Sequence, residues 1–452
     1  MFAATGTNRS PGLLLPCQIP ISNPSARKAE MNHATLDAES TPPRAEQATS
    51  AASRLERVRV IVVLGALVAL GPLTIDMYLP ALPAIGDDLL TTSSAVQLTL
   101  TGTLLGLGLG QLLVGPFSDA VGRRLPLILG TVLHIASSLL CIVAPNIAVL
   151  GLLRALQGVG AAATMVVALA VVRDLYSGRA AATALSRLML VMGAAPILAP
   201  TLGGAILLTG SWRGVFAALA VLGGILLLVA IFALDETLPP QRRLPGEVRP
   251  VLRAYRTLLT DGKFMIMALV AALGMSGLFS YVSGSSFVLQ EQFGLDQQEF
   301  ALVFGAGAVA LIGASQLNVV LLNRWTERQI VLSSLAAATA FGVVLVALTT
   351  TGTGGLLGFI LPLWFLLGAF GFVLPNAPAL ALSRHGETAG TAAALLGAGQ
   401  FGLGALIAPL VGLLGNDGPA MALTMTGGSA VALLALGAML RHERRTGAVE
   451  AV

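Results

Sequence analysis

The chain has 452 residues, of which 55% are hydrophobic and only 11% are charged, whereas an ordinary soluble domain has roughly 25% charged residues. The mean hydropathy of +0.85 excludes a soluble globular fold. Most of the 52 glycines and 23 prolines lie within apolar stretches, which is typical of helical membrane proteins. The formal net charge of +4 comes from arginine, because Lys28 and Lys263 are the only lysines. Two cysteines, Cys17 and Cys141, cannot form a disulfide framework.

The N-terminal region is polar and rich in Ser, Thr, Ala and Pro, which predicts a disordered cytoplasmic tail over residues 1–55. Its apolar stretch, Leu13–Leu15, is too short for the core of a signal peptide. Met31 is an alternative to Met1 as the start of translation, and N-terminal sequencing of the expressed protein would distinguish the two.

After the tail, apolar stretches of about 20 residues recur, each long enough to cross roughly 30 Å of hydrocarbon as a helix. They predict an all-α polytopic membrane protein with twelve transmembrane helices in two six-helix halves. The halves are residues 56–234 and 264–440, joined by a linker over 235–263 and followed by a tail over 441–452. The expected spans are 59–85, 95–117, 125–144, 147–172, 181–208, 213–234, 264–289, 300–322, 329–350, 355–382, 389–414 and 419–440.

The basic residues indicate the orientation. Of the 26 lysines and arginines, all except Arg154 and Arg213 lie in the two tails, the linker, or the loops and span ends on the same face. The positive-inside rule therefore predicts that both termini and the linker are cytoplasmic, in a multi-pass protein of a bacterial-type inner (cell) membrane. Trp212 and Trp325 lie near span ends, where interfacial anchors are expected.

The two halves resemble each other in sequence. ILAPTLG at 197–203 is similar to LIAPLVG at 406–412, at an offset of 209, and the turns at 85–86 and 293–294 match at an offset of 208. This repeat favours a pseudo-symmetric transporter in which the substrate lies between the halves.

Two ionisable residues lie deep within predicted spans, Asp76 in the first and Arg154 in the fourth. An intramembrane charge costs several kcal/mol, so both are candidate functional groups. Counting along the helices places them about 16 and 13 Å below the outer span ends, at depths that allow one shared cavity. One interpretation is a protonatable carboxylate coupled to a cationic neighbour. The other is a fixed ion pair that holds spans 1 and 4 together.

Prolines and glycines mark the shapes of three spans. We expect prolines to interrupt the first and fifth spans, and glycines on one face of the second span to permit close packing. The prolines are Pro72, Pro80 and Pro83 in span 1 and Pro196 and Pro200 in span 5, and the glycines are Gly102, Gly106 and Gly110.

The loop after span 2 is the most specific motif, reading GPFSDAVGRR over 115–124. Its glycines allow a tight turn, and Asp119 is expected near the positive N-terminal end of the next helix. The loop resembles the G-x-L-a-D-R-x-G-R-[RK] motif of the major facilitator superfamily, with Ala120 in place of the usual arginine. The resemblance implies a cytoplasmic gate formed by Gly115, Asp119, Gly122, Arg123 and Arg124.

Further motifs carry the same resemblance. Arg154 with Gln157, Gly158 and Gly160 resembles the R-x-x-q-G motif, and APTLGG at 199–204 resembles the G-P-x-x-G-G antiporter motif. DMYLPALP at 76–83 and SWR at 211–213 are similar to the Bcr/CflA (bicyclomycin/chloramphenicol resistance) subfamily of drug:H⁺ antiporters. The resemblance implies proton-driven export by alternating access, with Asp76 as the proton site and Arg154 as its partner. It assigns Pro196, Pro200, Gly203 and Gly204 to the antiporter motif.

The superfamily lines its substrate cavity with spans 1, 2, 4, 5, 7, 8, 10 and 11. Aromatic and neutral amide side chains on these spans would suit small amphipathic, chloramphenicol- or bicyclomycin-like drugs, although such side chains also serve as helix-packing contacts. The candidates are Tyr78, Gln157, Tyr281, Phe287, Gln316, Asn318, Asn376, Gln400 and Phe401.

Other signals do not support a function. The G-x-G-x-x-G match at 397–402 lies within an apolar span, no P-loop motif is present, and the four histidines lack metal-ligand spacing. We expect no metal, no cofactor, no nucleic-acid partner and no enzymatic activity, because clustered catalytic groups are missing. We expect a monomer acting on a drug-like small molecule, protons and the lipid bilayer. The alternatives are transport of a metabolite, such as a sugar or amino-acid derivative, and passive facilitation.

Overall fold

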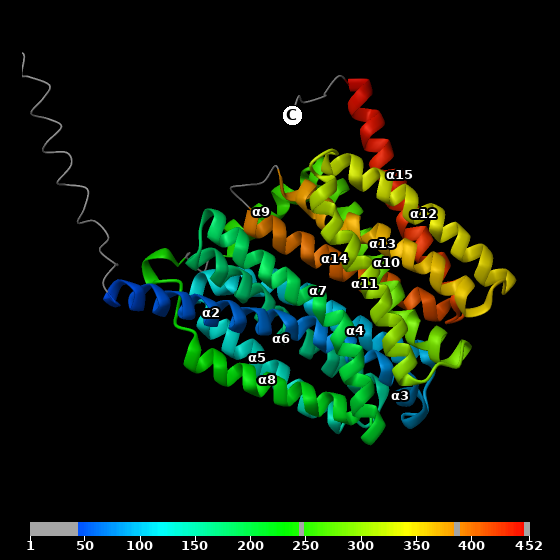
Figure 1. The fold of residues 1–452 in the computed structure, drawn as a ribbon, viewed down its shortest axis with the longest axis horizontal. Coiled ribbons are helices and arrows are strands. Elements are labelled where there is room, and N and C mark those ends of the chain that lie inside the picture. The colour runs from blue at the N-terminus through cyan, green and yellow to red at the C-terminus, as the bar shows by residue number, and fades with distance from the viewer. Residues whose placement is uncertain (1–43, 244–247, 384–388, 447–452) are drawn as a thin grey trace, which may run out of the picture. The chain divides into compact units, whose positions relative to one another are not determined.

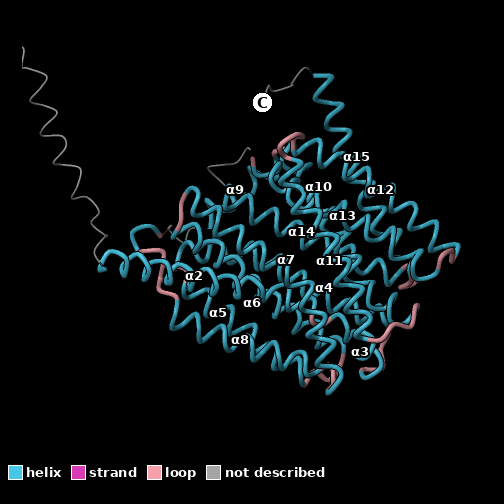
Figure 2. Tube along the Cα trace, in the orientation of Figure 1, coloured by secondary structure: helices cyan, strands magenta, loops and turns pink. Residues whose placement is uncertain are grey.

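The computed structural model describes residues 44–243, 248–383 and 389–446 (Figures 1 and 2). Every regular element in these ranges is helical. Twelve helices among the described residues are long and apolar enough to span a membrane, which confirms the predicted all-α fold. The described residues from Val58 onward form one compact unit, and the packing below is that of this unit.

The first span consists of three pieces. These are α2 (Arg44–Asp76), the 3₁₀ helix η1 (Leu79–Ala81) and α3 (Leu82–Asp88). Because α2 begins at Arg44, the end of the predicted tail is helical, while residues 1–43 lie outside the described residues. The other helices of the N-terminal half are α4 (Ser93–Val121), α5 (Arg124–Ile142), α6 (Ile147–Leu175), α7 (Gly178–Thr209) and α8 (Arg213–Ala233).

The linker contains two helical segments, η2 (Pro240–Arg242) and α9 (Val248–Thr260). Span 7 is α10 (Gly262–Phe287), which continues into the π-helical turn η3 (Val288–Gln292). The remaining spans are α11 (Gln297–Leu321), α12 (Glu327–Thr351), α13 (Gly355–Leu382), α14 (Ala389–Leu413) and α15 (Gly418–Thr446). Helix α15 therefore extends into the predicted C-terminal tail.

The packing of helices repeats between the halves. Helix α4 packs on α6 as α11 packs on α13, and α5 packs on α8 as α12 packs on α15. The halves meet through α4 with α14 and α7 with α11, which are equivalent pairs under the repeat. These four helices lie in the middle of the bundle, between α5 and α8 on one side and α12 and α15 on the other (Figure 1).

Glycines set the distance between α4 and α6. A Cβ atom at Gly102 would meet the carbonyl oxygen of Gly151, and one at Gly106 would meet that of Ala155. Gly158 of α6 lies equally close to the backbone of α4. Small residues allow such close backbone approach, which stabilises helix pairs in lipid. The predicted role of the span 2 glycines is confirmed.

Two expectations at span ends and kinks are wrong. Helix α7 is continuous with Pro196 and Pro200 inside it, and α2 is continuous with Pro72 inside it, so these three prolines do not interrupt their spans. Trp212 is only 3% exposed and cannot be an interfacial anchor. Its indole instead donates to Asp88 at 3.1 Å and packs edge-on against Phe216, which fixes the outer end of span 1 to the start of α8.

Candidate functional site

Span 1 breaks directly after Asp76, the last residue of α2, whose side chain is 5% exposed. Pro80 is the second residue of η1, and Pro83 is the second residue of α3. At the start of a helix the N–H group that proline lacks is not needed for an intrahelical hydrogen bond. Gly203 of the antiporter motif packs on this break, because a Cβ atom there would collide with the carbonyl of Met77. The sequence motif therefore determines how closely α7 approaches the end of α2.

Arg154 is fully buried and points toward the same region. Its Nη1 donates to the carbonyl of Thr74 at 3.0 Å and to Oε1 of Gln157 at 2.5 Å, and the guanidinium lies 4.4 Å from the ring centroid of Tyr78. Its Nε and Nη2 have no hydrogen-bond partner among the described residues. The described salt bridges do not include an Asp76–Arg154 pair, so this conformation lacks the fixed ion pair.

The candidate cavity residues of spans 1, 4 and 7 are closed off. Tyr78, Gln157, Tyr281 and Phe287 are all 3% exposed or less. The hydroxyl groups of Tyr78 and Thr99 are 2.8 Å apart, so a ligand would have to replace that contact. These positions are occluded in this conformation, and their role in substrate binding stays a prediction.

The candidates of spans 8, 10 and 11 fall into different environments. Asn318 and Asn376 are buried and hydrogen-bonded to each other, with Asn376 Nδ2 donating to Asn318 Oδ1 at 2.7 Å. Gln316 is exposed, whereas Gln400 and Phe401 are half-buried. The asparagine pair joins α11 to α13, a contact that stabilises helix packing in membranes.

The apolar region where the halves meet has no space large enough to hold a water molecule. Drug-sized pockets start at about 300 Å³, so no drug-sized pocket is open at this place. Helices α2, α4, α10 and α14 line it through Ile75, Leu100, Leu104, Phe279, Val282, Ser283 and Ala408. Because Ile75 precedes Asp76, the end of α2 lies at the seam between the halves.

Polar side chains close the end of this seam that the predicted orientation makes the outer one. Ser94 donates to the carbonyl of Gly412 at 3.0 Å, and Gln97 donates to the carbonyl of Ser283 at 3.3 Å and to the side chain of Asn416. Two further donors from α10 and η3, Ser286 and Gln290, reach the carbonyls of Leu79 and Pro80. We refer to these contacts as the outer seal.

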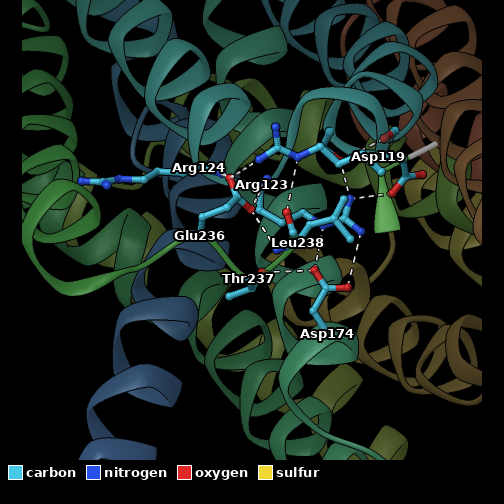
Figure 3. A network of polar contacts seen from close by, with 10 residues as sticks. Asp119, Arg123, Arg124, Asp174, Glu236, Thr237 and Leu238 are labelled. Carbon is cyan, nitrogen blue, oxygen red and sulfur yellow. Dashed lines mark hydrogen bonds and ion pairs between the residues drawn. The ribbon is translucent and has the colours of Figure 1, made fainter. Parts of the chain in front are cut away.

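A polar network surrounds the motif at 115–124, at the opposite end (Figure 3). The expectation of a loop over these residues is wrong for most of them, because α4 continues to Val121 and only Gly122 and Arg123 separate it from α5; the term motif loop is kept for this segment. Arg123 forms ion pairs with Asp119 at 2.5 Å and Asp174 at 2.8 Å, and donates to Ser118 at 2.9 Å. These carboxylates hold the pKa of Arg123 above its ordinary value against the opposing effect of burial. Arg124 donates to the carbonyl of Ile231 at 2.7 Å. The proposed gate residues thus tie α4, α5, α6 and α8 together within one half.

Glu236, and not Asp119, occupies the N-terminal end of α5. Its carboxylate accepts the backbone amides of Arg123 at 2.8 Å, Arg124 at 3.2 Å and Leu238 at 2.9 Å (Figure 3). Burial alone would raise the pKa of Glu236, but these amides and the nearby Arg243 hold it below its ordinary value. Glu236, which follows α8, thus satisfies the free amides at the start of α5, whereas Asp119 pairs with the side chain of Arg123.

The C-terminal half has a corresponding acid. Glu443 of α15 pairs with Arg328 of α12 at 2.7 Å and with Lys263 of α10 at 3.6 Å. Glu236 and Glu443 differ by 207 in number, close to the repeat offset. Sequence reasoning did not single out Asp174, Glu236 or Glu443. The available signal was their placement at span ends on a face that is otherwise strongly basic.

Twelve spans in two pseudo-symmetric halves that meet through equivalent helix pairs define a polytopic transporter of the two-repeat class. The comparisons with known proteins agree, since residues 64–409 match the family model of the Major Facilitator Superfamily. This chain belongs to that superfamily and is a transporter, not an enzyme.

Several relatives align over most of the chain. It is 40% identical over 361 residues to an uncharacterised MFS-type transporter, YdgK, of Bacillus subtilis, covering 79% of this chain and 89% of the relative. It is 30% identical to a bicyclomycin resistance protein homolog of Haemophilus influenzae, with coverages of 79% and 89%. It is 31% identical to a chloramphenicol resistance protein of Pseudomonas aeruginosa, with coverages of 76% and 80%.

A solved structure shares the fold. The D-xylose–proton symporter superposes with a TM-score of 0.66 at 16% identity, covering 84% of this chain and 96% of the symporter. At this identity the likeness shows the fold alone.

Proposed function

We propose that this chain is a proton-coupled multidrug exporter of the Bcr/CflA subfamily, which exports small amphipathic antibiotics by alternating-access antiport. The names of two relatives that are at least 30% identical support the drug class. We further propose a monomeric protein of the inner membrane with both termini in the cytoplasm. The distribution of arginine supports this orientation.

The observation that carries the proposal is the environment of Asp76. Its side chain is buried at a helix break and has no salt-bridge partner among the described residues. An ionised carboxylate in such a place carries a desolvation cost, which either protonation or approach of a cation removes. Asp76 also lies close enough to Tyr281 of the other half to interact electrostatically. We therefore propose that protonation of Asp76 changes the packing between the halves.

Purified protein in liposomes, with a pH-sensitive dye and an imposed proton gradient, tests the proposal. Addition of chloramphenicol- or bicyclomycin-like compounds should release protons in the wild type and in Asp87→Asn, a matched change of an exposed acid in the same span. Asp76→Asn should still bind drug but release no protons. Drug equilibration without proton movement in the wild type would instead make this protein a passive facilitator.

Cross-linking of the outer seal tests alternating access independently of protons. With Cys17→Ser and Cys141→Ser as background, Gln97→Cys and Asn416→Cys place thiols on α4 and just beyond α14, at side chains now in hydrogen-bond contact. A short, cleavable cross-linker with two thiol-reactive groups, such as a bis-methanethiosulfonate, should stop transport, and cleavage should restore it. Unchanged transport after quantitative cross-linking would contradict opening at this end.

A further inference from the structure

A closed circuit of hydrogen bonds joins α2, α5 and α6 beside Asp76. Nε2 of His134 lies 2.8 Å from Oγ1 of Thr74, whose carbonyl accepts from Arg154 at 3.0 Å. Arg154 donates to Gln157 at 2.5 Å, Gln157 donates to Ser138 at 2.7 Å, and Ser138 donates to the carbonyl of His134 at 2.7 Å. All five side chains are 1% exposed or less.

The direction of the His134 bond follows from its neighbour. The single hydroxyl proton of Thr74 is donated to the carbonyl of Leu70 at 2.6 Å, so Nε2 of His134 must be the donor to Thr74. The imidazole therefore carries a proton on Nε2, as assigned from the network. Its Nδ1 has no partner among the described residues and faces Gly223 of α8, where a Cβ atom would lie 3.4 Å away.

The packing leaves the imidazole little freedom. A Cβ atom at Gly160 of α6 would collide with the backbone and Cβ of His134, and Gly223 bounds the ring from α8. Two glycines from different helices thus allow α5 to place the ring against Thr74. Such close packing favours one orientation of the ring.

The circuit determines where Arg154 binds. Both protons of its Nη1 are used, by the Thr74 carbonyl and by Gln157, while Nε and Nη2 have no described partner. Thr74 precedes Asp76 by two residues in the last turn of α2. A rotation of that turn would therefore remove an acceptor of Arg154 and move the Asp76 carboxylate at the same time.

We propose that His134 is a positioning residue for proton coupling: by donating to Thr74 it fixes the last turn of α2, so that Arg154 stays bonded to the Thr74 carbonyl and away from Asp76. This inference rests on the proposed antiport. The titratable and charged groups that interact with Asp76 or Arg154 from the surrounding elements are Tyr78 beyond α2, His134 and Cys141 of α5, and Tyr281 of α10.

The test is the pH profile of drug–proton exchange in proteoliposomes, with thermal stability measured in parallel. His134→Leu removes the donor, and Thr74→Val removes its acceptor while keeping the branched shape. Each should lower the pH midpoint of exchange by up to about one unit, because a freed Arg154 can approach the ionised carboxylate. The double variant should show the same shift as either single change, since the two remove one interaction.

Two variants separate positioning from a general loss of packing. His134→Gln retains an amide donor and should restore the midpoint. Ser137→Ala is the control on α5, because its buried hydroxyl donates to the carbonyl of Leu133 in its own helix, and its midpoint should equal that of the wild type.

The possible outcomes are distinct. Wild-type exchange with unchanged midpoints in His134→Leu and Thr74→Val would overturn the inference and leave the proposed function standing. Lower thermal stability without a midpoint shift would also overturn it, because His134 would then serve packing alone. Absence of drug-dependent proton movement in the wild type would refute the proposed function itself, and the inference with it.

Discussion

Gly122 is the position of the motif loop at which a side chain should be most damaging. Its φ of +103° and ψ of 172° belong to a region that is nearly restricted to glycine, where other residues incur strain of about 1–3 kcal/mol. A Cβ atom there would also collide with the carboxylate of Glu236 and approach the guanidinium of Arg243.

The collision matters because Glu236 holds the start of α5. Its carboxylate accepts three backbone amides, and a hydrogen bond to a charged group contributes about 1.5–3 kcal/mol. The contribution is smaller here because the side chain is 29% exposed. Together with the strain at Gly122, Gly122→Ala should lower the free energy of unfolding by about 2–5 kcal/mol.

Gly115 supplies the matched control from the same motif. It lies inside α4, and a Cβ atom there would meet nothing within 4 Å. Gly115→Ala should change stability by less than about 1 kcal/mol, because the better helix propensity of alanine is offset by the contact of its Cβ atom with the ring of Pro116. Thermal unfolding of the purified proteins in detergent compares the two. Equal melting temperatures for Gly122→Ala and the wild type, or equal losses for both variants, would refute the reasoning.

Three further predictions concern side-chain pairs and pH. Asp174→Asn should destabilise the protein by about 1–3 kcal/mol and Asp119→Asn by less than about 1 kcal/mol, because the two side chains are 17% and 40% exposed. Chemical denaturation measures both losses, and a larger loss in Asp119→Asn would contradict the prediction. Asn318→Leu or Asn376→Leu alone should lower the free energy of unfolding by about 0.6–1.7 kcal/mol. The double variant should lose less than the sum of the two single losses, because it leaves no unpaired amide. Additive losses in the same denaturation series would show that the two asparagines do not act as a pair. At pH values above its ordinary pKa range, ionised Glu236 stabilises the protein, and this contribution is lost as the pH falls through its lowered folded-state pKa. On acidification the melting temperature should therefore fall less in Glu236→Gln than in the wild type. Parallel curves of melting temperature against pH would contradict this role of Glu236.

The fold could be predicted because hydrophobic length and arginine distribution are local signals. Twelve apolar stretches, each as long as a bilayer is thick, specify twelve helices whatever their packing. The glycine face of α4 was also predictable, since helical spacing puts Gly102 and Gly106 on one side. Helix α9 was not predicted, because its arginines and aliphatic residues were interpreted as a charged linker.

The sequence identified residues of the candidate site but not the contacts that they make. The position of Asp76 and the depth of Arg154 follow from counting along helices, but their separation depends on the acceptors available to Arg154. The sequence offered Asp119 as the acid nearest the start of α5. The structure uses Glu236 there, more than a hundred residues further along the chain. Long-range partners of this kind are determined by tertiary packing, which a single sequence does not display.

The outer seal has an energetic consequence. It consists of neutral hydrogen bonds, and none of the salt bridges among the described residues joins the two halves. Asp87 and Glu291, one from each half, are like charges close enough to interact. Each neutral bond contributes only about 1 kcal/mol, since water replaces it on opening. Separation of the seal thus requires a few kcal/mol, the same order as the roughly 2.3 kcal/mol released when one elementary charge crosses 100 mV.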